Sequence, residues 1–428
     1  MTDGEGDDAR SVHFARTHYI HAMAPAETTP TYFRKGFGLK AEVHDSLVSD
    51  YSGHLVDVMR AHDGILAVGE ITVQLAREFG FCYGVERAVE YAYQTRTKFP
   101  DRRIFLAGEI IHNPHVNAKL GHMGINFLRP GPTGFDFSEV EPHDVVIVPA
   151  FGVTMGDFQT LRDKGVVVVD TTCGSVLNVW KRVDSYARDG FTSLIHGKYY
   201  HEETRATASQ VAKYAGGTYL VVRSMEQAHD VCDYIEGKGL SRESFLAKYR
   251  VQASAHFDPD IHLARIGVAN QTTMLARESL AIGEAAGQAM ARARGEAYRA
   301  ENFRTFDTIC SATQDRQDAV NELLREPLDV MLVIGGYNSS NTISLAALCD
   351  ERVPTFHVAD ASCIDVAKGS VRHLRPGGAE EIETAGWLQT DGELRAGITA
   401  GASTPNNKIG EAVARIFASR GVDPAGIV

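Results

Sequence analysis

Short apolar runs alternate with amphipathic segments along most of the chain. Runs of Val, Ile, Leu and Ala long enough for one buried strand predict eight strands: Ile104–Ala107, Val145–Pro149, Val166–Val169, Thr192–Ile195, Thr218–Val222, Arg265–Ala269, Val330–Ile334 and Thr355–Val358. Segments with the period of a helix follow most of these runs. Strands that alternate with helices in this way are typical of α/β units with mostly parallel sheets.

Three stretches depart from this alternation. Residues 1–65 form an extension of mixed character, with a predicted amphipathic helix over Ser46–Ala61. Gly237–Pro259 reads as a polar connection or an insertion, and Ile409–Ser419 as one last helix. The acidic segment 1–8 lacks the features of a signal or transit peptide.

Small and polar residues gather where the predicted strands end. They form the clusters 108–113, 170–173, 196–198, 270–273, 335–341 and 399–403. Ligands of open parallel sheets bind at the carboxyl edge of the strands. We therefore expect several lobes that point their binding edges at one centre.

Composition and charge narrow the class of protein. A chain of 428 residues is long enough for two or three domains. A net charge of −12 argues against nucleic-acid binding, because no basic stripe is available to neutralise phosphates. No apolar run is long enough to span a membrane, so we expect a cytoplasmic protein that contacts neither nucleic acid nor membrane.

Three of the six cysteines share one local pattern. Cys82, Cys173 and Cys310 each stand between an extended segment and the start of an amphipathic helix, about one lobe apart in the chain. The positive end of a helix dipole favours the thiolate, which is the reactive and metal-ligating form. Cys232 and Cys349 lie within apolar helical patterns and Cys363 in a loop, so structural roles are expected for them.

Three thiolates from three lobes would make an unusual metal site. A structural zinc site normally closes with four ligands, and no C-x-x-C pair is present. A cubane 4Fe-4S cluster held by three cysteines leaves one iron open to substrate. The remaining alternative is that all three are ordinary structural thiols.

The strand ends also offer neutral hydrogen-bond donors of the kind that bind an anion. They are His112, His201, Thr272, Ser339, Ser340, Asn341 and Ser403, and a diphosphate is the natural ligand for such a set. Glu203 is an acid among these donors. It is either a solvated helix carboxylate or a proton carrier whose pKa is raised by the neighbouring anion.

Eight segments in one order resemble the LytB family of 4-hydroxy-3-methylbut-2-enyl diphosphate reductases. They are 80–88, 109–114, 170–173, 196–204, 270–274, 309–317, 338–342 and 399–405, among them Gly80-Phe81-Cys82-Tyr83-Gly84 and His201-Glu202-Glu203-Thr204. The resemblance runs from about residue 66 to 415. The form of the motifs and the long N-terminal extension are similar to the plant and cyanobacterial branch.

The resemblance implies an α/β fold of three pseudo-equivalent lobes, a trefoil around a central iron–sulfur cluster. The ranges expected from it are an N-terminal extension (1–65), lobe 1 (66–172), lobe 2 (173–305), lobe 3 (306–397) and a C-terminal segment that returns to lobe 1 (398–428).

The resemblance also implies an activity and a set of site residues. The reaction is the reductive dehydroxylation of 4-hydroxy-3-methylbut-2-enyl diphosphate to isopentenyl and dimethylallyl diphosphate, the last step of the non-mevalonate isoprenoid pathway. By motif, Cys82, Cys173 and Cys310 would ligate one 4Fe-4S cluster with one open iron. Glu203 and Thr272 would form a proton relay, and the diphosphate would be held by His112, His201, Ser339, Ser340, Asn341 and Ser403.

An external electron donor is also implied, because the glycine-rich segment 335–338 lacks the spacing of a dinucleotide fingerprint. A ferredoxin or a flavodoxin is expected. Two other functions stay open: a non-redox iron–sulfur hydro-lyase, which needs no electrons, and an iron–sulfur sensor that binds a diphosphate without turning it over.

Two positions depart from the family pattern. The bacterial branch often offers a first-lobe histidine to the diphosphate, but the corresponding strand end here carries Phe151, which cannot donate. That contact is either lost or supplied by another group. Gly174 follows Cys173 where proline is usual, so a looser helix start is expected there, with an N–H free to bond sulfur.

Overall fold

The computed structural model describes residues 31–131, 134–378 and 380–423, and the structural statements below concern these residues. The expectation for the acidic segment 1–8 lies outside them. All eight predicted strands are present, each within one residue of its expected ends. The apolar runs were sufficient to find them because these strands are buried on both faces.

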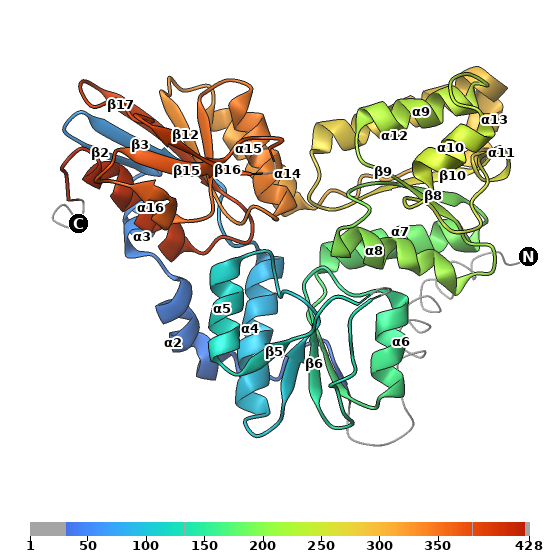
Figure 1. Cartoon of the computed structure of the whole chain (residues 1–428), viewed down its shortest axis with the longest axis horizontal. Coiled ribbons are helices and arrows are strands. Elements are labelled where there is room, and N and C mark those ends of the chain that lie inside the picture. The colour runs from blue at the N-terminus through green and yellow to red at the C-terminus, as the bar shows by residue number, and fades with distance from the viewer. Residues whose placement is uncertain (1–30, 132–133, 379, 424–428) are drawn as a thin grey trace, which may run out of the picture.

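The strands form three sheets, each in its own lobe, arranged around a common centre (Figure 1). The first sheet has the order β1 (Tyr32–Phe33), β7 (Val167–Asp170), β6 (Val145–Val148), β4 (Ile104–Leu106) and β5 (Ile125–Phe127). All its pairs are parallel. Its helices are α4 (Tyr83–Lys98), α5 (Pro114–His122) and α6 (Met155–Asp163), and α2 (Lys40–Tyr51) packs on α4.

The second sheet is also parallel throughout. Its order is β11 (Phe303–Thr305), β10 (Ile266–Asn270), β8 (Thr192–His196) and β9 (Tyr219–Val222). The helices of this lobe include α7 (Gly174–Arg188), α8 (Glu202–Ala208), α9 (Met225–Ile235) and α12 (Ala276–Arg294). Gly237–Pro259 is not only a polar connection, because it contains α10 (Arg242–Tyr249), whose Phe245 and Tyr249 are buried in the core of this lobe.

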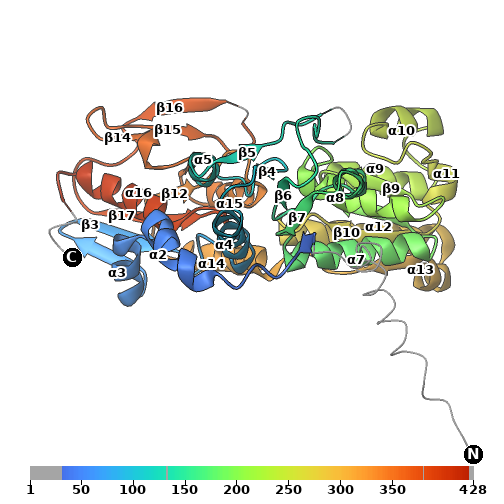
Figure 2. The ribbon, with the colours of Figure 1, turned by 90° about the horizontal axis from the view of Figure 1, so that it is seen from below.

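The third sheet is mixed. Its order is β14 (Ile364–Asp365), β15 (Ser370–Leu374), β13 (Thr355–Val358), β12 (Val330–Ile334), β17 (Leu394–Ala400), β3 (Ile71–Leu75) and β2 (Ile65–Val68), with β16 (Glu381–Ala385) paired to β15. α14 (Ser311–Leu323), α15 (Ser340–Asp350), α16 (Asn406–Ala418) and α3 (His54–Ala61) belong to this lobe. In Figure 2, α3 and α16 lie beside β3 and β17.

This sheet order corrects two of the expected boundaries. The C-terminal strand β17 does return to β3, in parallel register, but β3 belongs to the third sheet and not to lobe 1. β17 also pairs with β12 on its other side. The reason is packing, because side chains of β3, β12 and β17 are buried in one core together with α16. The first lobe therefore begins after β3, and residues 398–423 contribute the end of β17 and all of α16 to the third.

The described part of the N-terminal extension joins two lobes. β1 adds an edge strand to the first sheet, and its Tyr32 hydroxyl donates to Asp170 Oδ2 at 2.5 Å. The single helix expected over Ser46–Ala61 is instead two helices, α2 and α3, because the chain breaks at Ser52 and Gly53. A Cβ on Gly53 would lie 2.5 Å from the backbone oxygen of Asn406, so the extension crosses the start of α16 at close range.

No helix in the described ranges is long and apolar enough to cross a bilayer.

The close crossing at Gly53 gives a stability prediction. We expect Gly53→Ala to lower the midpoint of thermal unfolding, at a cost of about 1–3 kcal/mol, because the methyl group would meet backbone that cannot rotate away. Gly156→Ala, in α6, is the control: its nearest neighbour would lie 3.8 Å away, and alanine favours a helix. Equal unfolding midpoints for the two variants would contradict the prediction.

Candidate active site

The three cysteines that share one local sequence pattern are each the N-cap residue of a helix, one in each lobe. Cys82 precedes α4, Cys173 precedes α7 and Cys310 precedes α14. The first two come from different lobes to the same place: a Cβ on Gly84 would lie 2.6 Å from Cys173 Sγ and 3.9 Å from Cys82 Sγ. Glycine at this position therefore makes room for the sulfur of the second lobe.

Burial dominates the protonation of these thiols. It raises the pKa of Cys82, although N–H groups of Val85 and Gly84 and the charge of Arg316 act against it. Burial raises the pKa of Cys310 to about 11, although its sulfur accepts from Thr313 N at 3.3 Å and contacts Thr313 Oγ1 at 3.0 Å. The helix dipole alone was expected to favour the thiolate. That expectation is wrong for Cys82 and Cys310, because burial raises the pKa of each and favours the thiol when no cation is bound.

Two arginines bond the backbone just before two of the cysteines, Cys173 and Cys82. Arg87 of α4 donates to the backbone oxygens of Thr171 and Thr172 at 3.0 and 2.5 Å, just before Cys173. Arg316 of α14 is 4% exposed and donates to Gly80 O at 2.6 Å, just before Cys82. The sequence analysis missed both roles, although both residues stand in the first two turns of the cysteine helices.

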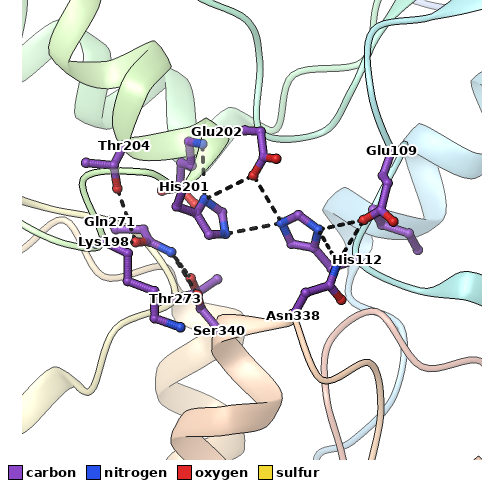
Figure 3. A network of polar contacts seen from close by, with 12 residues as sticks. Glu109, His112, Lys198, His201, Glu202, Thr204, Gln271, Thr273, Asn338 and Ser340 are labelled. Atoms are coloured by element: carbon purple, nitrogen blue, oxygen red, sulfur yellow. Dashed lines mark hydrogen bonds and ion pairs between the residues drawn. The ribbon is translucent and has the colours of Figure 1, made fainter. Parts of the chain in front are cut away.

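His112 and His201 meet between the first two lobes (Figure 3). Their Nε2 atoms lie 3.2 Å apart, and His112 Nδ1 lies 2.8 Å from Glu109 Oε2. His201 caps α8, and its Nδ1 accepts from the backbone N–H of Glu203 at 3.1 Å. Neutral His201 therefore carries its proton on Nε2 and donates it to His112, whose own proton faces Glu109. Burial lowers the pKa of His201 well below its usual range.

Phe151 packs directly against this pair. Its ring stacks on that of His112 at 4.6 Å between centroids with an interplanar angle of 14°. It also meets the ring of His201 edge-on at 6.1 Å. Where the bacterial pattern has a donor, this chain therefore has an aromatic wall that holds the histidines in place.

Glu203 is buried beside the histidines, with 3% exposure. Its Oε1 accepts from Thr272 N at 2.6 Å and its Oε2 accepts from Thr272 Oγ1 at 3.0 Å. Burial raises the pKa of Glu203 to about 7, and the Thr272 hydrogen bonds oppose this rise. The sequence suggested that a neighbouring anion would raise the pKa, but burial is the cause in the protein alone.

The third lobe adds the remaining donors. Ser339 caps α15, and Ser340 and Asn341 form its first turn. Asn341 Oδ1 accepts from Ala402 N at 2.9 Å, while its buried Nδ2 has no hydrogen-bond partner among the described residues. Ser403 Oγ donates to His112 O at 3.1 Å. An unpaired buried amide of this kind is costly unless a ligand accepts from it.

Two residues outside the predicted set, Gln271 and Asn338, and one backbone contact connect these groups. Gln271 Nε2 donates to Ser340 Oγ at 3.1 Å, which joins the second lobe to the third. Asn338 donates to Glu109 Oε2 at 3.0 Å, which joins the third lobe to the first. The N–H of Cys310 bonds the backbone oxygen of Thr272 at 3.3 Å. The predicted site residues thus lie in one region where the three lobes meet.

The chain is similar to proteins of known family along most of its length. The sequence model of the family described as "LytB protein" matches residues 73–417. The 4-hydroxy-3-methylbut-2-enyl diphosphate reductase of Gloeobacter violaceus is 48% identical over 400 residues, 92% of this chain and 94% of that one. The protein of the same name from Microcystis aeruginosa is 45% identical over 393 residues, 92% and 96% of the two chains.

A solved structure shares the fold. The E-1-hydroxy-2-methyl-but-2-enyl-4-diphosphate reductase from Plasmodium falciparum superimposes with a TM-score of 0.59 at 20% identity, over 82% of this chain and 89% of that one. The expected α/β fold of three lobes is confirmed by this likeness and by the three sheets.

Proposed function

The chain belongs to the LytB protein family, and from that premise we propose that it works as a reductase at the point where its three lobes meet. It removes the hydroxyl group of 4-hydroxy-3-methylbut-2-enyl diphosphate and forms isopentenyl and dimethylallyl diphosphate, the last step of the non-mevalonate pathway. The observation that carries the proposal is the convergence of three capping cysteines, one from each lobe, on a region lined by histidines, serines and Glu203.

The family implies an iron–sulfur cluster, and the cysteines of this chain suit one. Among the described residues the three sulfur atoms do not form a group with all separations within 4.8 Å. Zinc bound to thiolates at about 2.3 Å would draw them to about 3.8 Å of one another. Wider spacing, three sulfurs and nearby arginines support a 4Fe-4S cluster held by Cys82, Cys173 and Cys310, with one iron left open.

When bound, such a cluster supplies single electrons and a Lewis-acidic iron without a protein ligand. The overall change takes up two electrons and two protons, breaks the C–O bond and releases the oxygen as water. Glu203 is the proton donor in this proposal: with its pKa raised to about 7, a substantial fraction of its carboxyl groups hold a proton at neutral pH, and burial isolates them from bulk water. Thr272 orients that carboxyl group through two hydrogen bonds.

The diphosphate is bound by donors from all three lobes. His112, His201, Ser339, Ser340, Asn341 and Ser403 are assigned to it, and the unpaired Nδ2 of Asn341 is the clearest vacant donor among them. Neutral donors bind an anion without adding charge to a buried region. His201 presents its Nε2 proton to His112 in the protein alone, and that proton is the one available to a phosphate oxygen.

Electrons must come from a partner protein. A one-electron donor such as a ferredoxin or a flavodoxin is expected, because the chain has no nicotinamide or flavin fingerprint.

An anaerobic assay tests the function. Purified protein with its cluster is incubated with 4-hydroxy-3-methylbut-2-enyl diphosphate and dithionite plus a mediator, and the products are identified by mass spectrometry. We expect isopentenyl and dimethylallyl diphosphate, with two electrons consumed for each. Dehydration without electron uptake would favour the hydro-lyase, and binding without any product would favour a sensor.

Cluster assembly gives a second prediction. Gly84→Ala should lower the iron and sulfide content of anaerobically purified protein, because its methyl group would take the place of Cys173 Sγ. Cys82→Ser should lower it at least as far. Gly121→Ala in α5 is the matched control, since its Cβ would meet nothing closer than 3.7 Å. A full cluster content in Gly84→Ala would contradict this placement of the sulfur.

The assignment of Glu203 as the proton donor gives a third prediction. Turnover should fall as pH rises through about 7, because the raised pKa of Glu203 leaves it protonated below that value and ionised above it. Glu203→Gln should lose about 100-fold or more in kcat and retain its affinity for inorganic diphosphate. The control is Glu226→Gln, an exposed carboxylate of α9. Near-normal turnover in Glu203→Gln would refute the assignment.

A further inference from the structure

Lys198 stands at the edge of this site, two residues beyond the end of β8. Its backbone N–H donates to Gln271 Oε1 at 3.1 Å, and Gln271 Nε2 donates to Ser340 Oγ at 3.1 Å. The same Gln271 oxygen accepts from Thr204 Oγ1 at 3.1 Å. Figure 3 shows the Lys198 side chain running from Gln271 toward the end of α15 that Ser340 opens. Its position is therefore fixed at the backbone by the contact between the second and third lobes.

The Lys198 ammonium group lacks a counter-charge. Among the described residues no carboxylate lies within 4.0 Å of it, although most other lysines near the protein surface are paired. The side chain is partly buried, and burial lowers its pKa, with the charge of Arg223 acting in the same direction. A partly buried cation without a partner is costly, and an anionic ligand would remove that cost.

The charges around it show why an anion needs this cation. The acids near the histidines are Glu109, Glu202 and Glu203, and Glu202 Oε2 lies 3.7 Å from His112 Nε2. His201 is neutral, and the other assigned donors are hydroxyl and amide groups. Phe151 offers a ring instead of a donor. A multiply charged diphosphate would therefore meet carboxylates and neutral donors, with Lys198 as a positive side chain beside them.

We propose that the Lys198 ammonium group binds the diphosphate of the substrate and supplies the charge that Phe151 cannot. This inference rests on the proposed function for its substrate and on the contacts of Gln271 and Ser340 for its geometry. Lys198 acts here as a binding residue and takes no part in proton transfer. Its ammonium would donate to phosphate oxygens at the start of α15, where backbone N–H groups also face an anion.

Binding of inorganic diphosphate to the oxidised, cluster-containing protein tests this without turnover. Isothermal titration is carried out on the wild type and on Lys198→Met, Lys198→Gln and Lys198→Arg. We expect Kd to rise about 10-fold to 100-fold in the Met and Gln variants, because a charged hydrogen bond is lost. Lys198→Arg should recover much of the affinity. Lys98→Met, an exposed lysine at the far end of α4 from Cys82, should leave Kd unchanged.

A kinetic measurement separates binding from positioning of other groups. Lys198→Met should raise KM with little change in kcat, because a charge that binds substrate and transition state equally affects KM alone. Cluster absorbance and the unfolding midpoint should match the wild type. Less than a twofold change in diphosphate Kd in both neutral variants would overturn the proposal. A rise in Kd for Lys198→Arg as large as that for the neutral variants would overturn it too.

The outcomes also separate this inference from the function on which it rests. If the wild type makes neither product but Lys198→Met still weakens diphosphate binding, the binding role stands and the reductase assignment fails. If the wild type is an active reductase and the neutral variants bind diphosphate normally, only the role of Lys198 is wrong.

Discussion

The structure depends on one electrostatic constraint: three cysteines from three lobes are partly buried at helix N-termini, and burial raises the pKa of Cys82 and of Cys310. Burial outweighs the local N–H groups and Arg316 at Cys82, and Thr313 at Cys310. Binding a cluster must therefore release protons, and the energy gained also holds the lobes together. The arginine contacts to the backbone before Cys82 and Cys173 place the ligands in advance, so fewer contacts must form when iron binds.

Helix N-termini lie at both parts of the proposed site, the cysteines and the diphosphate donors. Cys82, Cys173, Cys310 and Ser339 are each the N-cap of a helix of eleven residues or more, and each helix directs its first N–H groups toward the centre. Partial positive charge from several helices favours whatever anion lies between them, whether sulfide-rich cluster or diphosphate. The fold thus provides a positive region in a chain with a net charge of −12.

The sequence was sufficient for eight of the strands, the helix starts at the cysteines and the family, because those buried strands are continuous apolar runs and the motifs are local. It was insufficient for long-range pairing. The C-terminal segment was expected to return to lobe 1, and β17 does pair with β3, but nothing local shows that both strands join β12 in the sheet of the third lobe. The break at Gly53 depends on contact with Asn406, and the raised pKa of Cys82 depends on burial by distant segments. Lys198 lay inside a recognised motif, yet its unpaired charge becomes visible only when its surroundings are known.

The position of β17 also sets an order of assembly during synthesis. All three cysteines emerge from the ribosome before β17 does, but the N–H groups of Gly80 and Cys82 bond the backbone oxygens of Ala400 and Ala402, which follow or end that strand. The first of the three cysteines to be translated is therefore bonded to residues that are translated after all three of them. A nascent chain that has not reached residue 402 carries three ligands without the residues that bond the Cys82 loop, so iron inserted then would meet an unfinished site.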